Sequence, residues 1–137
     1  MSNTKPIGVA YEDQDIIGAD FLYAAGELGY TAAAQSTVTQ ATSKSTGVTI
    51  NASAGQITMN NAALGATTNV SFTMTNNKIT SKDVVVVNVA GGTASNETYN
   101  CWVSGHTAGT CAIILRNISG GSLSEAVVIN FAIIHCT

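Results

Sequence analysis

From residue 36 onward, eight short runs rich in β-branched and aromatic residues divide the sequence. They read STVTQAT, GVTI, GQITM, TNVSFTMT, DVVVVNVA, ETYNCWVS, TCAIILRNI and EAVVINFAIIH, and clusters such as NASAG and AGGTASN separate them. Short runs punctuated by Gly, Asn and Ser are typical of strands joined by turns. No long helical pattern lies between them. The sequence therefore predicts an all-β domain, an antiparallel two-sheet sandwich of jelly-roll-like type.

Two of these runs have apolar residues on both faces. In TNVSFTMT large and small polar residues alternate, as in a strand with one solvated face. In DVVVVNVA and in the last run apolar residues occupy both faces of the strand. The apolar residues on the outer face must therefore be covered, either by a second layer of the same protein or by a neighbouring subunit. Each covered Val or Ile is worth roughly 1.5 to 3 kcal/mol. We expect the last strand to be central and to hold both the core and an oligomer contact, through Val128, Ile129, Phe131 and Ile133.

The first 35 residues differ from the rest of the chain in composition. They contain the only proline and five carboxylates against the single Lys5, and their glycines make a long helix costly. We expect an extended N-terminal arm over residues 1–35, followed by a β-sandwich domain over residues 36–137. The acidic arm could dock on a basic partner surface, or it could be a solvated leader.

The composition favours a subunit of an assembly. Charged residues make up 9% of the chain, where an ordinary domain has roughly 25%. A nearly uncharged polar surface repels its copies weakly, although an uncharged secreted domain is the alternative. The net charge of -3 gives no basic footprint for nucleic acid. Without an apolar run of signal-peptide or membrane-spanning length, we expect no membrane contact and synthesis in a cytoplasm.

No residue pattern predicts catalysis, a metal or a cofactor. Neighbouring residues such as His135 and Cys136 face opposite sides of a strand, and there is no G-x-S-x-G or phosphate-binding glycine motif. The acidic stretch DQDIIGAD lacks a calcium-loop ligand at Ile17. Cys101 and Cys111 flank a turn and are either adjacent thiols or a hairpin disulfide. Trp102 is expected in the core rather than on a sugar-stacking surface.

Four segments resemble a module common in virion structural proteins of tailed phages. They are GQITMNNAAL (55–64), VSFTMTN (70–76), DVVVVN (83–88) and GSLSEAVVINFAII (121–134), within a match that spans residues 46–135, about two thirds of the chain. The opening IGVAYEDQDI is similar to the start of short phage head-associated proteins. The stretch CWVSGHTAGTC (101–111) departs from the module's pattern.

The resemblance implies a noncatalytic capsid decoration (cement) protein on the outer surface of a phage head, made in the bacterial host cytoplasm. It implies the major capsid protein and further copies of the chain, as a homotrimer, as partners. The expected capsid-contact residues are Tyr11, Glu12, Asp13, Asp15, Asp20, Phe21, Leu22 and Tyr23. The alternative is a receptor- or glycan-binding knob on a fibre, with Tyr99, Trp102 and His106 in exposed loops.

Overall fold

A computed structural model describes residues 20–136 of the chain, which form eight strands and one short 3-10 helix. The helix η1 covers Ala32–Ala34. Each of the eight runs picked out in the sequence overlaps one strand, and the described residues hold no α-helix, so the all-β prediction is confirmed. The strands are β1 (Gln35–Thr39), β2 (Val48–Thr49), β3 (Ala54–Thr58), β4 (Asn69–Thr75), β5 (Val84–Gly91), β6 (Tyr99–Thr107), β7 (Thr110–Asn117) and β8 (Val128–Ile134).

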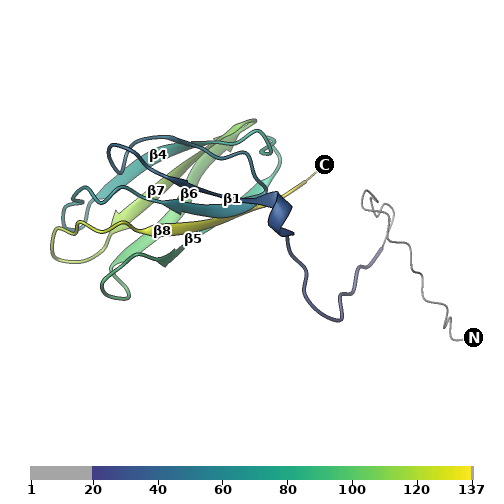
Figure 1. The fold of residues 1–137 in the computed structure, drawn as a ribbon, viewed down its shortest axis with the longest axis horizontal. Helices are drawn as coiled ribbons and strands as arrows, with labels where there is room; N and C mark the ends of the chain where they lie inside the picture. Colours follow the sequence, from purple (N-terminus) through teal and green to yellow (C-terminus); the bar gives the residue numbers. More distant parts are fainter. Residues whose placement is uncertain (1–19, 137) are drawn as a thin grey trace, which may run out of the picture.

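The strands form two four-stranded sheets that pack face to face (Figure 1). Sheet A has the order β1-β3-β8-β5 and sheet B the order β2-β4-β7-β6. The chain changes sheet at every connection up to β6, so the neighbours β1 and β3, and likewise β2 and β4, run parallel. The expectation of purely antiparallel sheets is therefore wrong at these two outer pairs. The other four pairs are antiparallel, because β8 and β7 enter each sheet as a reversed inner strand.

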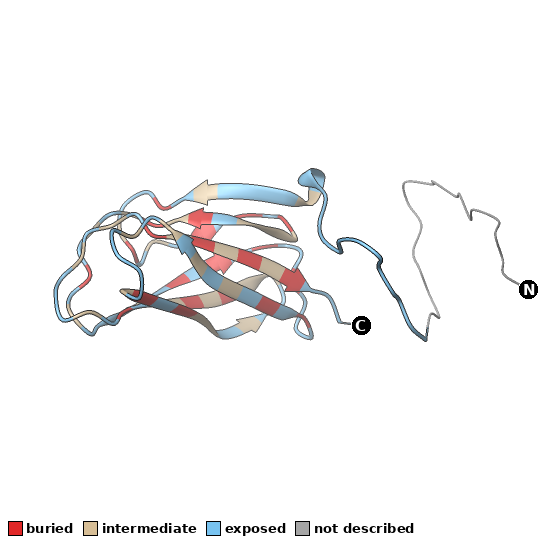
Figure 2. Cartoon of the chain, turned by 90° about the horizontal axis from the view of Figure 1, so that it is seen from below, coloured by how far each residue is buried: buried red, intermediate tan, exposed pale blue. Residues whose placement is uncertain are grey.

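The core lies between the two sheets and centres on these two reversed strands (Figure 2). Alternate residues of β8 and of β7 are fully or almost fully buried, while the residues between them are more exposed. Each such Ile or Leu contributes roughly 1.5 to 3 kcal/mol by leaving water. The buried residues of the two strands are Ile129, Phe131 and Ile133 of β8 and Cys111, Ile113 and Leu115 of β7.

Two buried asparagines fasten loops to sheet B. The side-chain nitrogen of Asn117 donates to the carbonyl oxygens of Leu64 and Gly121, at 3.0 and 2.7 Å. At the other end of the sandwich, Asn76 donates to the carbonyl oxygen of Ala52 at 2.7 Å. Buried backbone carbonyls need such donors, since an unpaired one costs about 1–3 kcal/mol. The two amides thus hold the loops that close the core.

Lys44 is buried in the connection between β1 and β2. Its ammonium group donates to the carbonyl oxygen of Asn60 at 2.6 Å and to that of Glu125. Burial lowers the pKa of Lys44, and the nearby Glu125 carboxylate opposes that shift. Because Asn60 follows β3 and Glu125 precedes β8, this one side chain connects three loops that join the two sheets.

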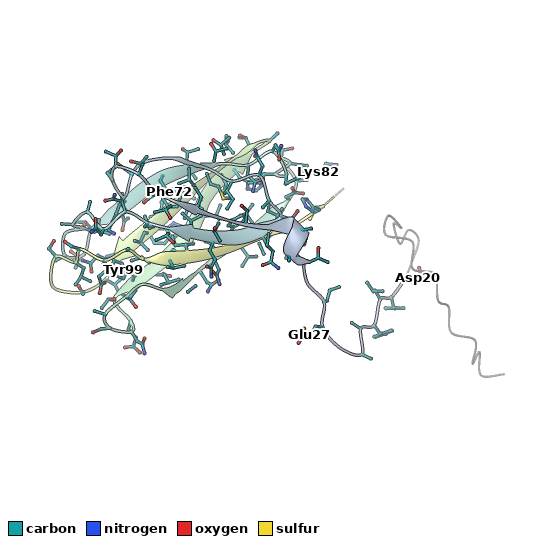
Figure 3. All side chains as sticks on the ribbon, in the orientation of Figure 1. Asp20, Glu27, Phe72, Lys82 and Tyr99 are labelled. Atoms are coloured by element: carbon teal, nitrogen blue, oxygen red, sulfur yellow. The ribbon has the colours of Figure 1, made fainter. Side chains whose placement is uncertain are left out.

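Residues 20–31 form neither a helix nor a strand, and all of them are exposed (Figure 1). Figure 3 labels Asp20 and Glu27 on this N-terminal segment, where both lie away from the sandwich. The segment and the end of β8 leave the sandwich at the same end. The last residues of the segment, near Tyr30, therefore lie close to the end of β8.

Candidate functional site

One end of the outer face of sheet A is apolar. The register places Val84 opposite Ile134 and Val86 opposite Ala132, so the four side chains form one cluster. Val84, Val86 and Ile134 are 50%, 48% and 57% exposed. We call these four residues the valine patch. The next pair along the two strands is polar, two asparagines facing each other, so the patch is confined to the end where the N-terminal segment begins.

The base of the N-terminal segment lies along the end of β8. The Tyr30 hydroxyl donates to the carbonyl oxygen of Ile133. Leu28, Gly29 and Tyr30 form one side of a groove of about 420 Å³, and residues 132–135 form the other. The groove is therefore continuous with Ala132 and Ile134 of the valine patch.

The N-terminal segment carries a second apolar surface. Phe21, Leu22 and Tyr23 are 77%, 63% and 86% exposed, and Leu28 is exposed as well. The rings of Phe21 and Tyr23 stack on each other, with centroids 6.0 Å apart and planes at 20°. Among the described residues, every exposed large apolar side chain except Ile118 belongs to this segment or to the valine patch. Uncovered apolar area is thus concentrated at one end of the molecule.

A buried carboxylate fixes the strand ends beneath the valine patch. Asp83 accepts hydrogen bonds from the backbone amides of Thr80 at 2.8 Å and Cys136 at 3.0 Å, and its Oδ2 lies 3.1 Å from Nδ1 of His135. The hydrogen bond from Thr80, followed by those from Cys136 and His135, holds the pKa of Asp83 far below its usual range against the opposing effect of burial. The carboxylate therefore stays charged and clamps the end of β8 beside the start of β5.

The structure places part of the predicted capsid-contact set. Tyr11, Glu12, Asp13 and Asp15 lie outside the described residues. Asp20 is exposed at the start of the described segment, next to the three apolar residues that follow it. Sequence reasoning did not single out Tyr30 or Asp83. Thr80 lies only three residues before Asp83, but its other two partners, His135 and Cys136, lie 52 and 53 residues further along the chain and could not be identified from the sequence.

The four residues assigned to core and oligomer contact divide between the two faces of β8. Ile129, Phe131 and Ile133 are buried in the core. Val128 is half-buried on the outer face, in register with Thr58 of β3. The inner three can hold the sandwich but offer no surface to a neighbour, so on this strand only the outer row is available for one.

Cys101 and Cys111 are both buried and free. The register sets Cys101 opposite Leu115 and Cys111 opposite His106. Four residues along a strand span roughly 13 Å, well beyond the reach of a disulfide. The hairpin disulfide considered from the sequence is therefore not formed. Burial raises the pKa of both thiols to about 11, which leaves them unreactive.

The three residues expected in exposed loops, Tyr99, Trp102 and His106, all belong to strand β6 instead. Tyr99 belongs to the core, with its pKa raised to about 12 by burial and then by the Glu125 carboxylate. His106 lies near the end of β6, opposite Cys111. Trp102 lies within β6 and is half-buried, outside the core cluster. The expectation of a core Trp102 is therefore wrong, because its parity on the strand is that of the outer face.

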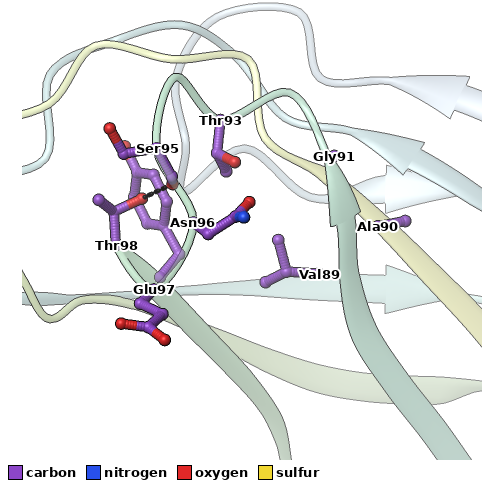
Figure 4. Close-up of a pocket in the computed structure, with 9 residues that line it drawn as sticks. Val89, Ala90, Gly91, Thr93, Ser95, Asn96, Glu97 and Thr98 are labelled. Carbon is purple, nitrogen blue, oxygen red and sulfur yellow. Dashed lines mark hydrogen bonds between the residues drawn. The ribbon is translucent and has the colours of Figure 1, made fainter.

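The connection between β5 and β6 encloses a polar pocket of about 280 Å³ (Figure 4). Thr93, Ser95, Asn96 and Glu97 line it, and Thr98 closes the turn by donating to the carbonyl oxygen of Ser95 at 2.9 Å. Within residues 20–136, no group of three or more His, Cys, Asp or Glu side chains is placed to hold a metal ion. The residues that line the pocket supply hydroxyl groups, one amide and one carboxylate, and no Cys or His side chain is among them.

No protein-family model, no curated protein and no solved structure matches this chain. Among the residues that the structure describes, no helix has the length and apolar character needed to cross a membrane.

Proposed function

We propose that the protein is a noncatalytic structural subunit of a virion, a decoration protein that binds the outer surface of a phage head and stabilises the shell. One observation carries the proposal: the uncovered apolar area is gathered in the N-terminal segment and the valine patch, at one end of an otherwise polar sandwich. Large exposed apolar patches mark protein contact sites. The resemblance of residues 46–135 to a phage virion module supports the same assignment.

The N-terminal arm is the capsid-docking element in this proposal. It comprises residues 1–35 and uses Tyr11, Glu12, Asp13, Asp15, Asp20, Phe21, Leu22 and Tyr23. The aromatic side chains of Phe21 and Tyr23 would each bury roughly 150–250 Å² on the major capsid protein. The carboxylates before them would meet basic groups of the shell and set the orientation of the arm.

The valine patch is the contact between copies. A homotrimer places three patches around one axis, with the jelly-roll-like sandwiches side by side and the arms directed at the shell. Packing outer-row side chains such as Val84, Val86 and Ile134 between subunits gains roughly 1.5 to 3 kcal/mol for each one covered fully. The subunit works mechanically, by adding buried area between neighbouring shell proteins, without a membrane, nucleic-acid or cofactor contact.

Substitution in the arm tests the capsid contact. The variant Phe21→Ser/Leu22→Ser/Tyr23→Ser should keep the sandwich intact, because these exposed side chains are not part of its core. We expect it to fold and to lose sedimentation with empty heads of the phage that encodes it. Ile118→Ser is the control, since it removes an exposed apolar side chain, 46% exposed, that lies outside both surfaces. Full binding by the triple variant would refute docking through the arm.

A further inference from the structure

The outer face of sheet B carries the half-buried indole of Trp102. Trp102 pairs with Ile114 of β7, which pairs in turn with Ser71 of β4, so the three side chains form one row across the sheet. The residues on either side of Trp102 in the chain belong to the opposite face, where Cys101 and Val103 join the core. The indole therefore rests against Ile114 on an outer surface.

Exposed polar side chains surround this indole. The next row across the sheet is Asn69, Arg116 and Asn100, all exposed. On the other side Thr73 is exposed, beside Ala112. Arg116 and Trp102 are diagonal neighbours across β7 and β6, a separation that long side chains bridge readily. The surface therefore consists of one indole with hydroxyl, amide and guanidinium groups on neighbouring positions.

Among residues 20–136, no carboxylate is paired with Arg116. The one ion pair among the described residues joins Asp83 and His135, and the guanidinium of Arg116 takes part in no hydrogen bond there. The outward positions of β4, β7 and β6 hold no Asp or Glu. An exposed guanidinium binds a carboxylate in a bidentate manner, and this face supplies none.

We propose that this face binds a carboxylated sugar, a uronic or sialic acid unit of a surface polysaccharide. The electron-rich face of the indole packs against the C–H face of the sugar ring, because those hydrogens carry partial positive charge. Asn69, Ser71, Thr73 and Asn100 are placed to exchange hydrogen bonds with ring hydroxyls, and Arg116 holds the carboxylate. We name this surface the tryptophan platform, comprising Trp102, Arg116 and those four polar residues.

The charge distribution favours an acidic sugar over a nucleic acid. A nucleic-acid strand needs several basic groups along its backbone, whereas this face offers Arg116 alone and the chain has a net charge of -3. One positive charge among hydroxyl and amide groups matches a ligand with one carboxylate and many hydroxyls. The inference does not rest on the decoration role, since the platform lies on the opposite sheet from the valine patch.

The platform contains its own reporter, because Trp102 is the only tryptophan of the chain. The full-length protein is titrated with oligogalacturonate and with sialyllactose, and tryptophan emission is recorded. We expect a saturable change with at least one acidic sugar and roughly tenfold weaker binding by Arg116→Gln. Lactose, which lacks the carboxylate, is expected to bind the wild type and Arg116→Gln equally weakly.

Two control variants make the test decisive. Lys78→Gln removes the same charge from another exposed position and is expected to leave sugar binding unchanged. Trp102→Leu, followed by calorimetry, is expected to abolish sugar binding while capsid binding persists. Three results would each overturn the proposal: no binding of either acidic sugar at millimolar concentration, equal losses in Arg116→Gln and Lys78→Gln, or Arg116-dependent binding of an oligonucleotide alone.

Discussion

The two sheets share a pairing pattern but present different outer faces. In each, a parallel outer pair is followed by a reversed strand and then by the last strand. Their inner faces are both apolar and meet in one core. Outside, sheet A ends in the valine patch, whereas sheet B carries Ser, Thr and Asn around Trp102 and Arg116. The inward-facing side chains and the strand pairing thus define the fold. The outward-facing side chains differ between the two sheets, so they give each sheet a different surface.

The largest expected effect separates the two faces of a single strand. Ile133 of β8 is fully buried, and its neighbour Ile134 is 57% exposed. Ile133→Ala is expected to lower the free energy of unfolding by about 2–5 kcal/mol, since it removes buried methyl groups and leaves a cavity. Ile134→Ala is expected to change it by less than about 1 kcal/mol. Urea unfolding measures both, and equal losses would contradict the assignment of the faces.

The next test concerns the loops fastened to sheet B. Asn117→Ala removes the donor for the carbonyls of Leu64 and Gly121, and we expect it to lower the free energy of unfolding by about 2–3 kcal/mol. Asn100→Ala, at an exposed position on the same sheet, is the matched control and should cost under about 0.5 kcal/mol. Thermal unfolding followed by circular dichroism compares the two. An unchanged free energy of unfolding in Asn117→Ala would mean that the side chain of Asn117 is not needed to hold these loops.

Self-association tests the outer face of sheet A. Val84→Ser/Val86→Ser is expected to weaken association between copies by roughly tenfold or more, because about 1.4 kcal/mol suffices for that change and two half-exposed valines supply it. The folded stability should hardly change. Analytical ultracentrifugation of the wild type, this variant and the Ile118→Ser control gives the comparison. A wild type that stays monomeric at high concentration would remove the contact between copies from the proposal.

A smaller effect on folding stability is expected when the pH is lowered, through the Asp83 carboxylate. Because the pKa of Asp83 is lower in the folded chain than its ordinary 3.8, its stabilising contribution is complete above that pH and declines as the pH falls below it. Asp83→Asn should therefore be less stable than the wild type at pH 7, and the difference should shrink toward pH 2. A difference that is constant with pH would show that the charge of Asp83 contributes nothing.

The smallest test distinguishes buried from exposed thiols. Cys101 and Cys111 face the core from sheet B with pKa values of about 11, whereas Cys136 is exposed beyond β8. A thiol reagent at pH 8 should label Cys136 rapidly in the folded protein and the other two only after denaturation. Cys136→Ser should then abolish the rapid phase. Rapid labelling of a second thiol would indicate that the inner face of sheet B opens readily.

Much of the fold could be predicted from local sequence, because β-branched runs and glycine-rich turns act over short distances. The parallel pairing of β1 with β3 could not, since it depends on the chain changing sheet between them. The clamp of Asp83 on Cys136 joins residues 53 positions apart and was equally invisible.

Trp102 is an instructive error. Tyr99, Cys101 and Val103 share one parity, and Asn100, Trp102 and Ser104 share the other. Hydrophobicity alone suggested the core, whereas the polar neighbours on its own parity indicated the outer face. Alternation along the strand was the better guide to the tryptophan platform.

The N-terminal segment and the residues after β8 leave the sandwich at the same end, which has a practical consequence for anyone who would display foreign peptides on this scaffold. A peptide inserted directly after Cys136 would emerge beside Tyr30 and Asp83, where it would crowd the N-terminal segment. The connection between β5 and β6 lies at the opposite end of the sandwich, so residues 93–97 could carry an inserted epitope without crowding that segment.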